Sequence, residues 1–255
     1  MSNTAIYPSL KDRVVFVSGG GSGIGGSIVE EFCQQGAKVA FVDIDSAASD
    51  ALVARMTDAG YATPLFLKCD LYDIAALQAA IAEVSEKLGT IRVLINNAAR
   101  DDRHDMDDVT PEYWDDRMAV NMKHHFFAAQ AVHKGMAEAG GGVIINMGSV
   151  SWMVGMGGMP GYTTAKAAIA GLTRSLARDL GPSNIRVNCV VPGHTWTQRQ
   201  IDLWTTPEMT AALMDRQCLK RKILPDEVAR IVLFFSSDDA AACTNQTYIV
   251  DGGLV

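Results

Sequence analysis

Residues 18–27 read SGGGSGIGGS and directly follow a short apolar run at 14–17. Gly19, Gly23 and Gly25 leave the backbone without side chains where a strand must turn sharply into a helix. Free N–H groups and the positive end of that helix attract an anion such as a pyrophosphate. Glycines also serve ordinary tight turns, so the stretch alone is a weak signal. It predicts a strand, a phosphate-binding turn and a helix.

Short apolar runs recur along the whole chain, with helical spacing between them. The runs are too apolar for half-exposed strands, and they lie at 14–17, 39–42, 65–67, 93–95, 143–145, 187–191 and 248–250. This alternation predicts an α/β fold of three layers, with a parallel sheet covered by helices on both faces. Four glycines at the predicted helix ends are expected to take positive φ, namely Gly36, Gly60, Gly89 and Gly181.

The size of the chain indicates one domain over residues 1–255. With 255 residues, 48% hydrophobic and 20% charged, it can bury a large core. Residues 194–224 interrupt the alternation and are interpreted as a mobile lid.

Charge and cysteine content exclude several functional classes. The 22 basic and 29 acidic residues leave a net charge of −7 without a basic run, so no nucleic-acid partner is expected. The 5 cysteines are scattered without a C-x-x-C pair, which favours a reducing cytoplasm. Residues 1–13 lack the apolar core of a signal peptide, and no run is long enough for a membrane helix. A cytoplasmic protein without a membrane partner is predicted.

Asp43 ends the second apolar run at the distance from Gly25 at which a carboxylate reaches the adenosine ribose hydroxyls. Its charge would repel a 2′-phosphate, and no basic side chain nearby offsets it, so the sequence favours NAD over NADP. Asp70, at the end of the third run, is expected either to hold the adenine edge or to form a turn.

The segment GYTTAK at 161–166 places Tyr162 and Lys166 four positions apart, and therefore on one face of a helix. A phenol has a pKa of about 10, so acting as a base near neutrality needs a depression worth about 4 kcal/mol. We expect the Lys166 ammonium to supply it. Ser149 ends another strand, at the edge of the sheet where ligands bind.

Several motifs occur in one order: SGGGSGIG, NNAA at 96–99, Asn121, Ser149, GYTTAK and VPG at 191–193. Together they resemble the short-chain dehydrogenase/reductase family. The resemblance implies a Rossmann-type, doubly wound sheet of about seven strands, a tetramer, and hydride transfer with a nicotinamide cofactor. It implies that Tyr162 is the catalytic acid/base, that Lys166 lowers its pKa and binds the ribose, that Ser149 orients the substrate and that Asn121 holds a relay water.

The resemblance also implies a set of residues that contact NAD. Thr195 is expected to meet the nicotinamide carboxamide through its backbone amide. Ala99 stands where the family usually has glycine and narrows the ribose side of the site. The implied NAD-binding residues are Gly19, Ser22, Gly23, Ile24, Gly25, Asp43, Asp70, Leu71, Asn97, Ala98, Tyr162, Lys166, Pro192, Gly193, Thr195 and Thr197.

A second resemblance concerns the substrate. The segments NAARDDRHD at 97–105 and GSVSWMVGM at 148–156 are similar to those of bacterial sugar dehydrogenases of the D-xylose and L-arabinose 1-dehydrogenase type. This implies oxidation of the anomeric hydroxyl of a small-molecule aldose to a lactone. The expected substrate contacts are Asp101, Ser149, Ser151, Trp152, Tyr162 and Arg199, with Trp152 stacked on the C–H face of the sugar.

Three other interpretations remain open. An NAD-dependent dehydrogenase of a secondary alcohol in a sugar acid or keto-deoxy acid would pair the substrate carboxylate with Arg100, Arg103 or Arg199. A catalytically silent NAD-binding protein is disfavoured by the intact catalytic residues, and a carbonyl reductase by Asp43. His124 and His125 are adjacent on a helix and expected to diverge, and no metal site is predicted.

Overall fold

The computed structural model describes residues 4–255, and within them seven strands form one sheet in the order β3-β2-β1-β4-β5-β6-β7. All neighbouring strands are parallel, so the predicted Rossmann-type sheet is confirmed. The strands are β1 Val14–Ser18, β2 Lys38–Asp43, β3 Leu65–Lys68, β4 Ile91–Asn96, β5 Gly142–Met147, β6 Ile185–Pro192 and β7 Thr247–Val250. The predictions about the N-terminal stretch and about one domain over 1–255 include residues 1–3, which lie outside the described part.

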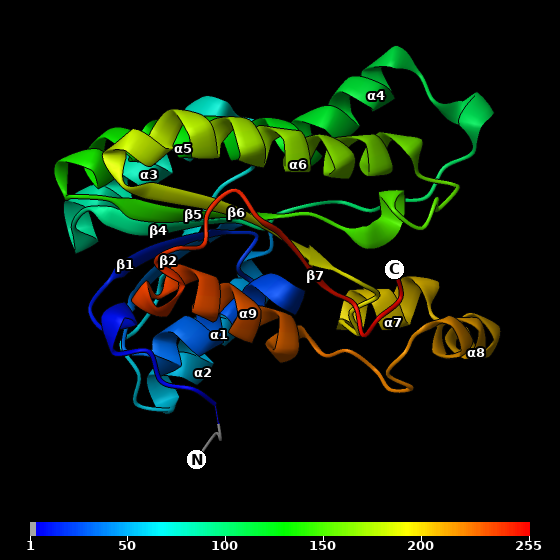
Figure 1. Ribbon diagram of the computed structural model, residues 1–255, viewed down its shortest axis with the longest axis horizontal. Coiled ribbons are helices and arrows are strands. Elements are labelled where there is room, and N and C mark those ends of the chain that lie inside the picture. The colour runs from blue at the N-terminus through cyan, green and yellow to red at the C-terminus, as the bar shows by residue number, and fades with distance from the viewer. Residues whose placement is uncertain (1–3) are drawn as a thin grey trace.

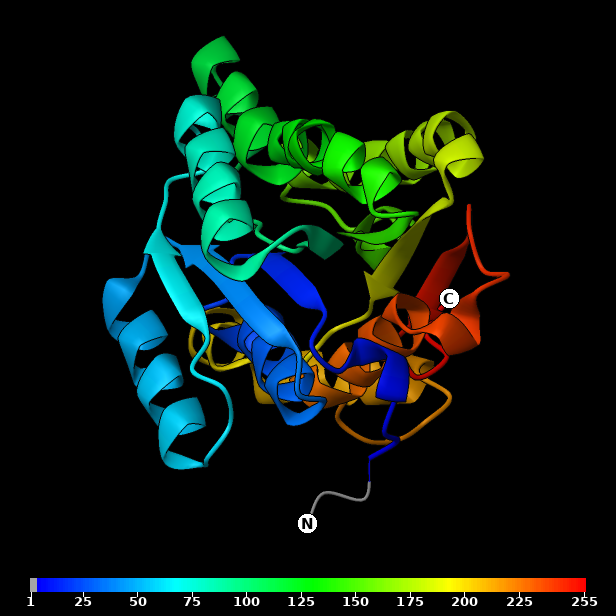
Figure 2. The same ribbon diagram turned by 90° about the vertical axis from the view of Figure 1, so that its left-hand side faces the viewer.

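Helices cover both faces of the sheet, as Figures 1 and 2 show. One face carries α1 Gly23–Gln34, α2 Ser46–Asp58 and α9 Pro225–Ser236; the other carries α3 Ile74–Leu88, α5 His124–Glu138 and α6 Pro160–Leu180. α4 Pro111–Met118 continues through the π-helical turn η3 Ala119–Lys123 into α5. Between β6 and α9 lie α7 Gln198–Trp204 and α8 Pro207–Arg216. The short 3-10 helices are η1 Pro8–Leu10, η2 Met106–Asp108, η4 Val150–Trp152, η5 Gly181–Ser183 and η6 Asp238–Ala240.

The central strands are buried on both faces because each face packs against helices. In β1, Val15 and Val17 join Phe32 of α1 in one apolar cluster. The alternating residue Phe16 joins Leu77 of α3 in the cluster on the opposite face. Strands buried in this way consist of continuous apolar runs, which is why these runs are conspicuous in the sequence.

The two outer strands differ from the expectation of full burial. β3 and β7 each pair with one neighbour, since they end the strand order. On β7, Tyr248 is 47% exposed and Ile249 is 36% exposed. An apolar run does not distinguish an edge strand from a central one, because the strand order is set by helix packing over the whole sheet.

Three of the four glycines at helix ends have the expected positive φ: Gly36 at 75°, Gly60 at 83° and Gly89 at 100°. Gly181 does not, since its φ is −55°. The chain instead continues through η5 and turns at Asn184, whose φ is 57°. Asn184 Nδ2 donates to the carbonyl of Gly140 at 2.9 Å, which holds this left-handed residue in place.

The chain switches direction within the sheet between β1 and β4, which lie side by side. Crossovers after these strands run to opposite faces and leave a crevice at the carboxyl ends of the strands. In Figure 1 the crevice end is on the right, where α7 and α8 extend beyond the sheet. Among residues 4–255, no helix is both long and apolar enough to cross a membrane.

Candidate active site

The glycine-rich turn between β1 and α1 depends on missing side chains. Gly19 has φ +65° and Gly23 has φ +56°, a region that L side chains rarely adopt. A Cβ on Gly25 would lie 1.9 Å from the Gly19 carbonyl oxygen. Only glycine therefore lets the start of α1 pack this closely on the turn. The first N–H groups of α1, which have no acceptor within the helix, and the positive end of the helix dipole therefore lie next to the turn.

Asn97 and Ser18 connect this turn to the segment that follows β4. Asn97 Nδ2 donates to the carbonyls of Ser18 at 3.1 Å and Gly19 at 2.9 Å. The Ser18 hydroxyl accepts from the backbone N–H groups of Asn97 at 3.0 Å and Ala98 at 3.2 Å. The NNAA segment thus fixes the position of the glycine turn.

Asp43 and Asp70 stand at the ends of β2 and β3. Asp43 Oδ2 accepts from the N–H of Gly21 at 2.9 Å, and its Oδ1 accepts from the N–H of Asp45 at 3.0 Å. Asp70 Oδ1 accepts from the N–H of Tyr72 at 3.1 Å, so it does form a turn. Both carboxylates also line the cavity described next.

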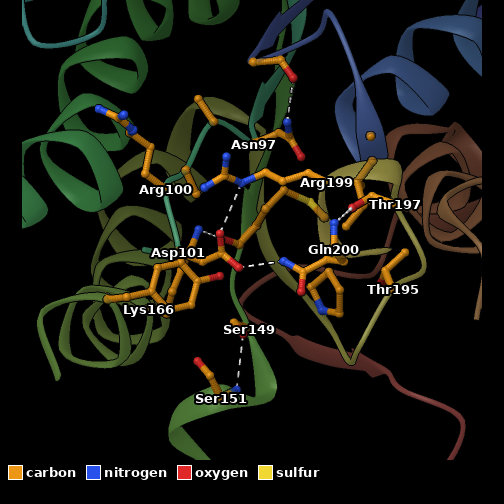
Figure 3. A pocket seen from close by; sticks show the side chains of 18 of the residues that line it. Asn97, Arg100, Asp101, Ser149, Ser151, Lys166, Thr195, Thr197, Arg199 and Gln200 are labelled. Atoms are coloured by element: carbon orange, nitrogen blue, oxygen red, sulfur yellow. Dashed lines mark hydrogen bonds and ion pairs between the residues drawn. The ribbon is translucent and has the colours of Figure 1, made fainter. Parts of the chain in front are cut away.

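One cavity of about 760 Å³ extends from the glycine turn to Tyr162 and under α7 and α8. Every residue that the sequence predicts to hold NAD lines it, so the chain's own residues fit a dinucleotide. The predicted substrate contacts Asp101, Ser149, Ser151 and Arg199 also line it, whereas Asn121 and Trp152 do not. Figure 3 shows these cavity residues from close by.

Tyr162 and Lys166 share the inner face of α6. Lys166 is 2% exposed, and its Nζ donates to the carbonyl of Met147 at 2.8 Å. The same Nζ lies 5.7 Å from the centre of the Tyr162 ring. Burial lowers the pKa of the Lys166 amine to about 8.

The expected depression of the Tyr162 pKa is not found. Burial raises the pKa of the Tyr162 phenol to about 12, opposed by a hydrogen bond with Ser149 and by the charge of Arg103. Lys166 does not offset this effect, because its ammonium is directed at the Met147 carbonyl and faces the ring. The four-residue spacing brings the groups together but does not determine the direction of the amine.

Ser149, and Ser151 of the 3-10 helix η4, both line the cavity. The Ser149 hydroxyl accepts from the backbone N–H of Ser151 at 3.2 Å, and it also forms the hydrogen bond with the Tyr162 phenol. Ser151 is 5% exposed, and its Oγ has no hydrogen-bond partner within residues 4–255. Trp152 is 38% exposed and is not among the residues that line the cavity, so its stacking on a sugar stays a prediction. Successive side chains of a 3-10 helix point about 120° apart, so Ser151 and Trp152 face different ways.

Asn121 lies behind the cavity wall in the π-helical turn η3. It is fully buried, and its Oδ1 accepts from the N–H of Arg100 at 2.8 Å. Its Nδ2 has no partner among the described residues. Single π-helical turns inside α-helices are frequent at functional sites.

Two aspartates after β4 bind side chains of α7. Asp101 Oδ2 accepts from Gln200 at 2.6 Å, and its Oδ1 lies 3.4 Å from Arg199 Nε. Asp102 accepts from Arg199 at 2.8 Å and from the buried Arg117 at 2.6 Å. These contacts hold α7 over the cavity (Figure 3).

His124 and His125 do not diverge as expected from their adjacency. Their ring centroids lie 4.4 Å apart, and both residues are fully buried. The π-helical turn just before them changes the helical phase. No group of three or more metal-ligating side chains is found within residues 4–255.

His194 and Gln200 also line the cavity, and neither is among the site residues predicted from the sequence. Gln200 lies within the segment expected to be a lid, and His194 directly follows VPG. Their positions in the predicted lid and next to VPG are the signals that the sequence offers. The contact of Gln200 with Asp101 and the packing of the His194 ring on Trp196 arise only in the folded chain.

Comparison with known proteins places this chain in a family. The family model described as enoyl-(acyl carrier protein) reductase matches residues 19–255. A solved structure, 3-oxoacyl-[acyl-carrier protein] reductase with bound NAD from Brucella melitensis, superposes with a TM-score of 0.88 at 30% identity, covering 100% of this chain and 98% of that one.

Two curated relatives are more similar in sequence. D-xylose 1-dehydrogenase of Caulobacter vibrioides is 49% identical, over 98% of this chain and 99% of its own length. A protein of Rhizobium meliloti named "Probable galactose dehydrogenase" is 49% identical, over 97% of each chain. Together with the parallel sheet, the glycine turn and the cavity, these matches show that this oxidoreductase, which uses a nicotinamide dinucleotide, belongs to the short-chain dehydrogenase/reductase family.

Proposed function

We propose that the protein oxidises the anomeric hydroxyl of an aldose, a pentose or a related sugar, to the lactone, with NAD as the hydride acceptor. The observation that carries this proposal is the 49% identity, over nearly the whole chain, to two proteins named as sugar dehydrogenases. The anomeric carbon bears a second oxygen, whose lone pair stabilises the developing carbonyl. Oxidation at this carbon is therefore easier than at an isolated secondary alcohol.

In the proposed reaction, Tyr162 takes the proton of the C1 hydroxyl while the C1 hydride departs. The Ser149 hydroxyl, which lines the cavity and is hydrogen-bonded to the Tyr162 phenol, donates to the substrate oxygen in this reaction. Bound NAD supplies a cationic pyridinium ring that accepts the hydride. Because burial raises the pKa of Tyr162 to about 12, with the charge of Arg103 opposing this, the base needs added positive charge, which Lys166 would supply if its ammonium turned from the Met147 carbonyl toward the phenol oxygen. Asn121, with a free buried amide, is proposed to hold the water that returns the proton to solvent.

The cofactor is proposed to lie along the cavity, with its pyrophosphate at the glycine turn and its adenosine ribose at Asp43. Asp43 already accepts hydrogen bonds from two backbone N–H groups, which fixes the carboxylate at the end of β2. A fixed negative charge there favours the ribose hydroxyls of NAD over the 2′-phosphate of NADP.

A neutral sugar fits the charges of the cavity better than a sugar acid does. Arg199 pairs with both Asp101 and Asp102, and Arg100 lies 3.8 Å from Asp102. Arg103 lies 5.0 Å from the centre of the Trp204 ring and donates to Met159. All three arginines that were candidates for binding a substrate carboxylate are therefore engaged, while Asp101 and Ser149 line the cavity with polar atoms suited to hydroxyls.

We also propose that residues 194–224 act as a lid over the sugar, on account of the contacts of Arg199 and Gln200 with the segment after β4. A homotetramer is proposed from family membership and from the exposed apolar edge at β7. A cytoplasmic location remains a prediction from the sequence.

The test is a panel of neutral aldoses, including D-xylose, L-arabinose and D-galactose, with matching aldonates and keto-deoxy acids, followed as NADH formation. We expect turnover with one or more aldoses and none that depends on a carboxylate. Turnover only with the acids would overturn the proposal. Tyr162→Phe should retain NAD binding, measured by calorimetry, and lose NADH formation by about a hundredfold or more. Unchanged turnover in this variant would exclude Tyr162 as the base.

A further inference from the structure

Arg103 is a cavity residue whose charge no acidic side chain neutralises. Its Nη1 donates to the Met159 thioether at 2.8 Å and to the backbone carbonyl of Asp101 at 3.4 Å. Neither acceptor is a carboxylate, and Arg103 forms no ion pair in the described part of the chain. Arg100 and Arg199, by contrast, both pair with aspartates. A guanidinium stays protonated in proteins, so Arg103 brings an uncompensated positive charge to the cavity wall.

Contacts with the start of α6 place Arg103 beside Tyr162. Met159, which accepts from Arg103, is the N-cap residue of α6, and Tyr162 lies in the first turn of that helix. The backbone N–H of His104 also donates to the carbonyl of Gly158 at 2.8 Å. The segment after β4 is therefore attached to the turn that carries the proposed base. Arg103, Met159 and Tyr162 all line the same cavity.

The helix α7 of the lid holds Arg103 from another side. The guanidinium carbon lies 5.0 Å from the centre of the ring of Trp204, the last residue of α7. A guanidinium over an indole face is attracted by the negative charge of that face. The same helix binds the carboxylate of Asp101, through Gln200 at 2.6 Å and Arg199 at 3.4 Å. α7 thus contacts the cation through a ring and neutralises the neighbouring carboxylate with an arginine.

These two charges act on the Tyr162 phenol in opposite directions. Burial raises its pKa to about 12, a hydrogen bond with Ser149 lowers it, the charge of Asp101 raises it and the charge of Arg103 lowers it. Lys166 is directed at a backbone carbonyl instead. The other charged or titratable groups of the cavity wall outside the proposed dinucleotide contacts are Arg100 after β4, His194 after β6, Arg199 on α7 and Arg216 on α8.

We propose that Arg103 is a second cation, beside Lys166, that favours the phenolate form of Tyr162, and that α7 holds it there through Trp204. Arg103 acts through Tyr162 and is therefore a positioning residue. The inference rests on the proposed function only in taking Tyr162 as the base. When α7 packs on the segment after β4, Asp101 is paired and Arg103 is held. Closing the lid thus makes the phenolate more favourable at the moment when the substrate is covered.

The first test is the pH dependence of kcat/KM for the alcohol at saturating NAD. Oxidation needs the phenolate, so the rate rises with pH through the pKa of Tyr162 and then levels off. Arg103→Met keeps an unbranched side chain but removes the charge, and we expect the midpoint of this rise to move up by about one pH unit. Arg103→Lys keeps the charge and should recover most of the shift. Arg174→Met, at an exposed position of α6 outside the cavity lining, is the matched control and should titrate as the wild type does.

The second test concerns the lid. Trp204→Leu removes the ring that holds the guanidinium, so the midpoint should move in the same direction by a smaller amount. The double variant Arg103→Met/Trp204→Leu should match Arg103→Met, because a residue that only holds the cation adds nothing once the cation is gone. A double variant whose shift is the sum of the two single shifts would contradict this role of Trp204.

A folded Arg103→Met variant with the wild-type midpoint would overturn the inference, even at a lower plateau rate, because a merely structural role slows the reaction at every pH. A KM that rises only for substrates with a carboxylate, at an unmoved midpoint, would make Arg103 a substrate-binding residue instead. Thermal unfolding verifies that each variant folds. Arg103→Gln, with the same expected shift, replaces a methionine variant that does not fold.

Failure of the proposed function is distinguishable from failure of this inference. The pH profile can be measured with any alcohol that the wild type oxidises, aldose or sugar acid, because the midpoint belongs to Tyr162. The ultraviolet absorbance of the phenolate gives the same midpoint without turnover, as the difference between each NAD-bound protein and its Tyr162→Phe form. A wild type that oxidises no aldose would overturn the proposed function, and equal phenolate midpoints in wild type and Arg103→Met would overturn the role of Arg103.

Discussion

A single carboxylate at the end of β2 combines a structural and a selective role. Asp43 accepts from the Gly21 N–H and so supports the glycine turn, and it lines the cavity where the adenosine ribose is proposed to lie. A Cβ on Gly21 would lie 3.0 Å from Asp43 Oδ2, so the turn offers no room for a basic side chain at that position. The proposed preference for NAD over NADP therefore rests on the charge of Asp43.

Asp43→Asn separates the two roles, because an amide oxygen still accepts from Gly21 while the negative charge is removed. We expect the ratio of kcat/KM for NAD to that for NADP to fall about tenfold, at nearly unchanged thermal stability. The measurement is initial rates with both cofactors. An unchanged ratio in a stably folded variant would show that other groups select the cofactor.

Tyr162 and Lys166 illustrate the limit of reasoning from spacing at this scale. Helical spacing correctly predicts that they share a face. Whether the amine lowers the phenol pKa depends on burial and on the acceptor that the amine finds. The Met147 carbonyl is that acceptor, and it belongs to strand β5, not to α6.

At the scale of elements, the start of α5 carries an unusual buried histidine pair. Burial and the nearby Lys166 lower the pKa of His124 to about 3, and burial also lowers the pKa of His125 well below its ordinary value. Both imidazoles are therefore neutral in the folded protein at neutral pH.

This pair predicts a loss of stability in acid. The unfolded state binds a proton near pH 6.5, whereas folded His124 does so only near pH 3, so stability present above pH 6.5 is lost as the pH falls between these values. Each such histidine contributes about 1.4 kcal/mol per pH unit in that window. Urea unfolding at pH 7 and pH 5, at fixed protein concentration, should show a smaller loss for His124→Asn.

His133→Asn on the same helix is the control, because His133 is not buried. It should leave the difference between the two pH values as in the wild type. Equal acid sensitivity in His124→Asn and wild type would mean that His124 does not titrate over this range.

At the scale of the whole molecule, the sheet ends at β7 in an exposed apolar strand. Tyr248 and Ile249 are partly exposed on this edge strand, which is unpaired on one side among the described residues. Natural sheets seldom leave such an edge open in solution. A partner subunit is the covering that a tetramer would provide.

Ile249→Lys should therefore weaken assembly through this edge. Sedimentation velocity should show the wild type near four times the 27.4 kDa chain mass and the variant at smaller species. Ile44→Lys, at another exposed apolar residue, is a matched comparison. A wild-type protein that sediments as a monomer would contradict the tetramer.

The sequence by itself determined the fold, the family and the set of residues at the cofactor crevice. Apolar runs, glycines and motif order are local properties, and a parallel sheet brings the carboxyl ends of its strands to one edge whatever their order. Only the tertiary structure decided the exposure of β7, the direction of Lys166, the outward position of Trp152 and the engagement of the arginines. Each of these depends on contacts between segments far apart in the chain, and such contacts leave no periodic pattern in the sequence.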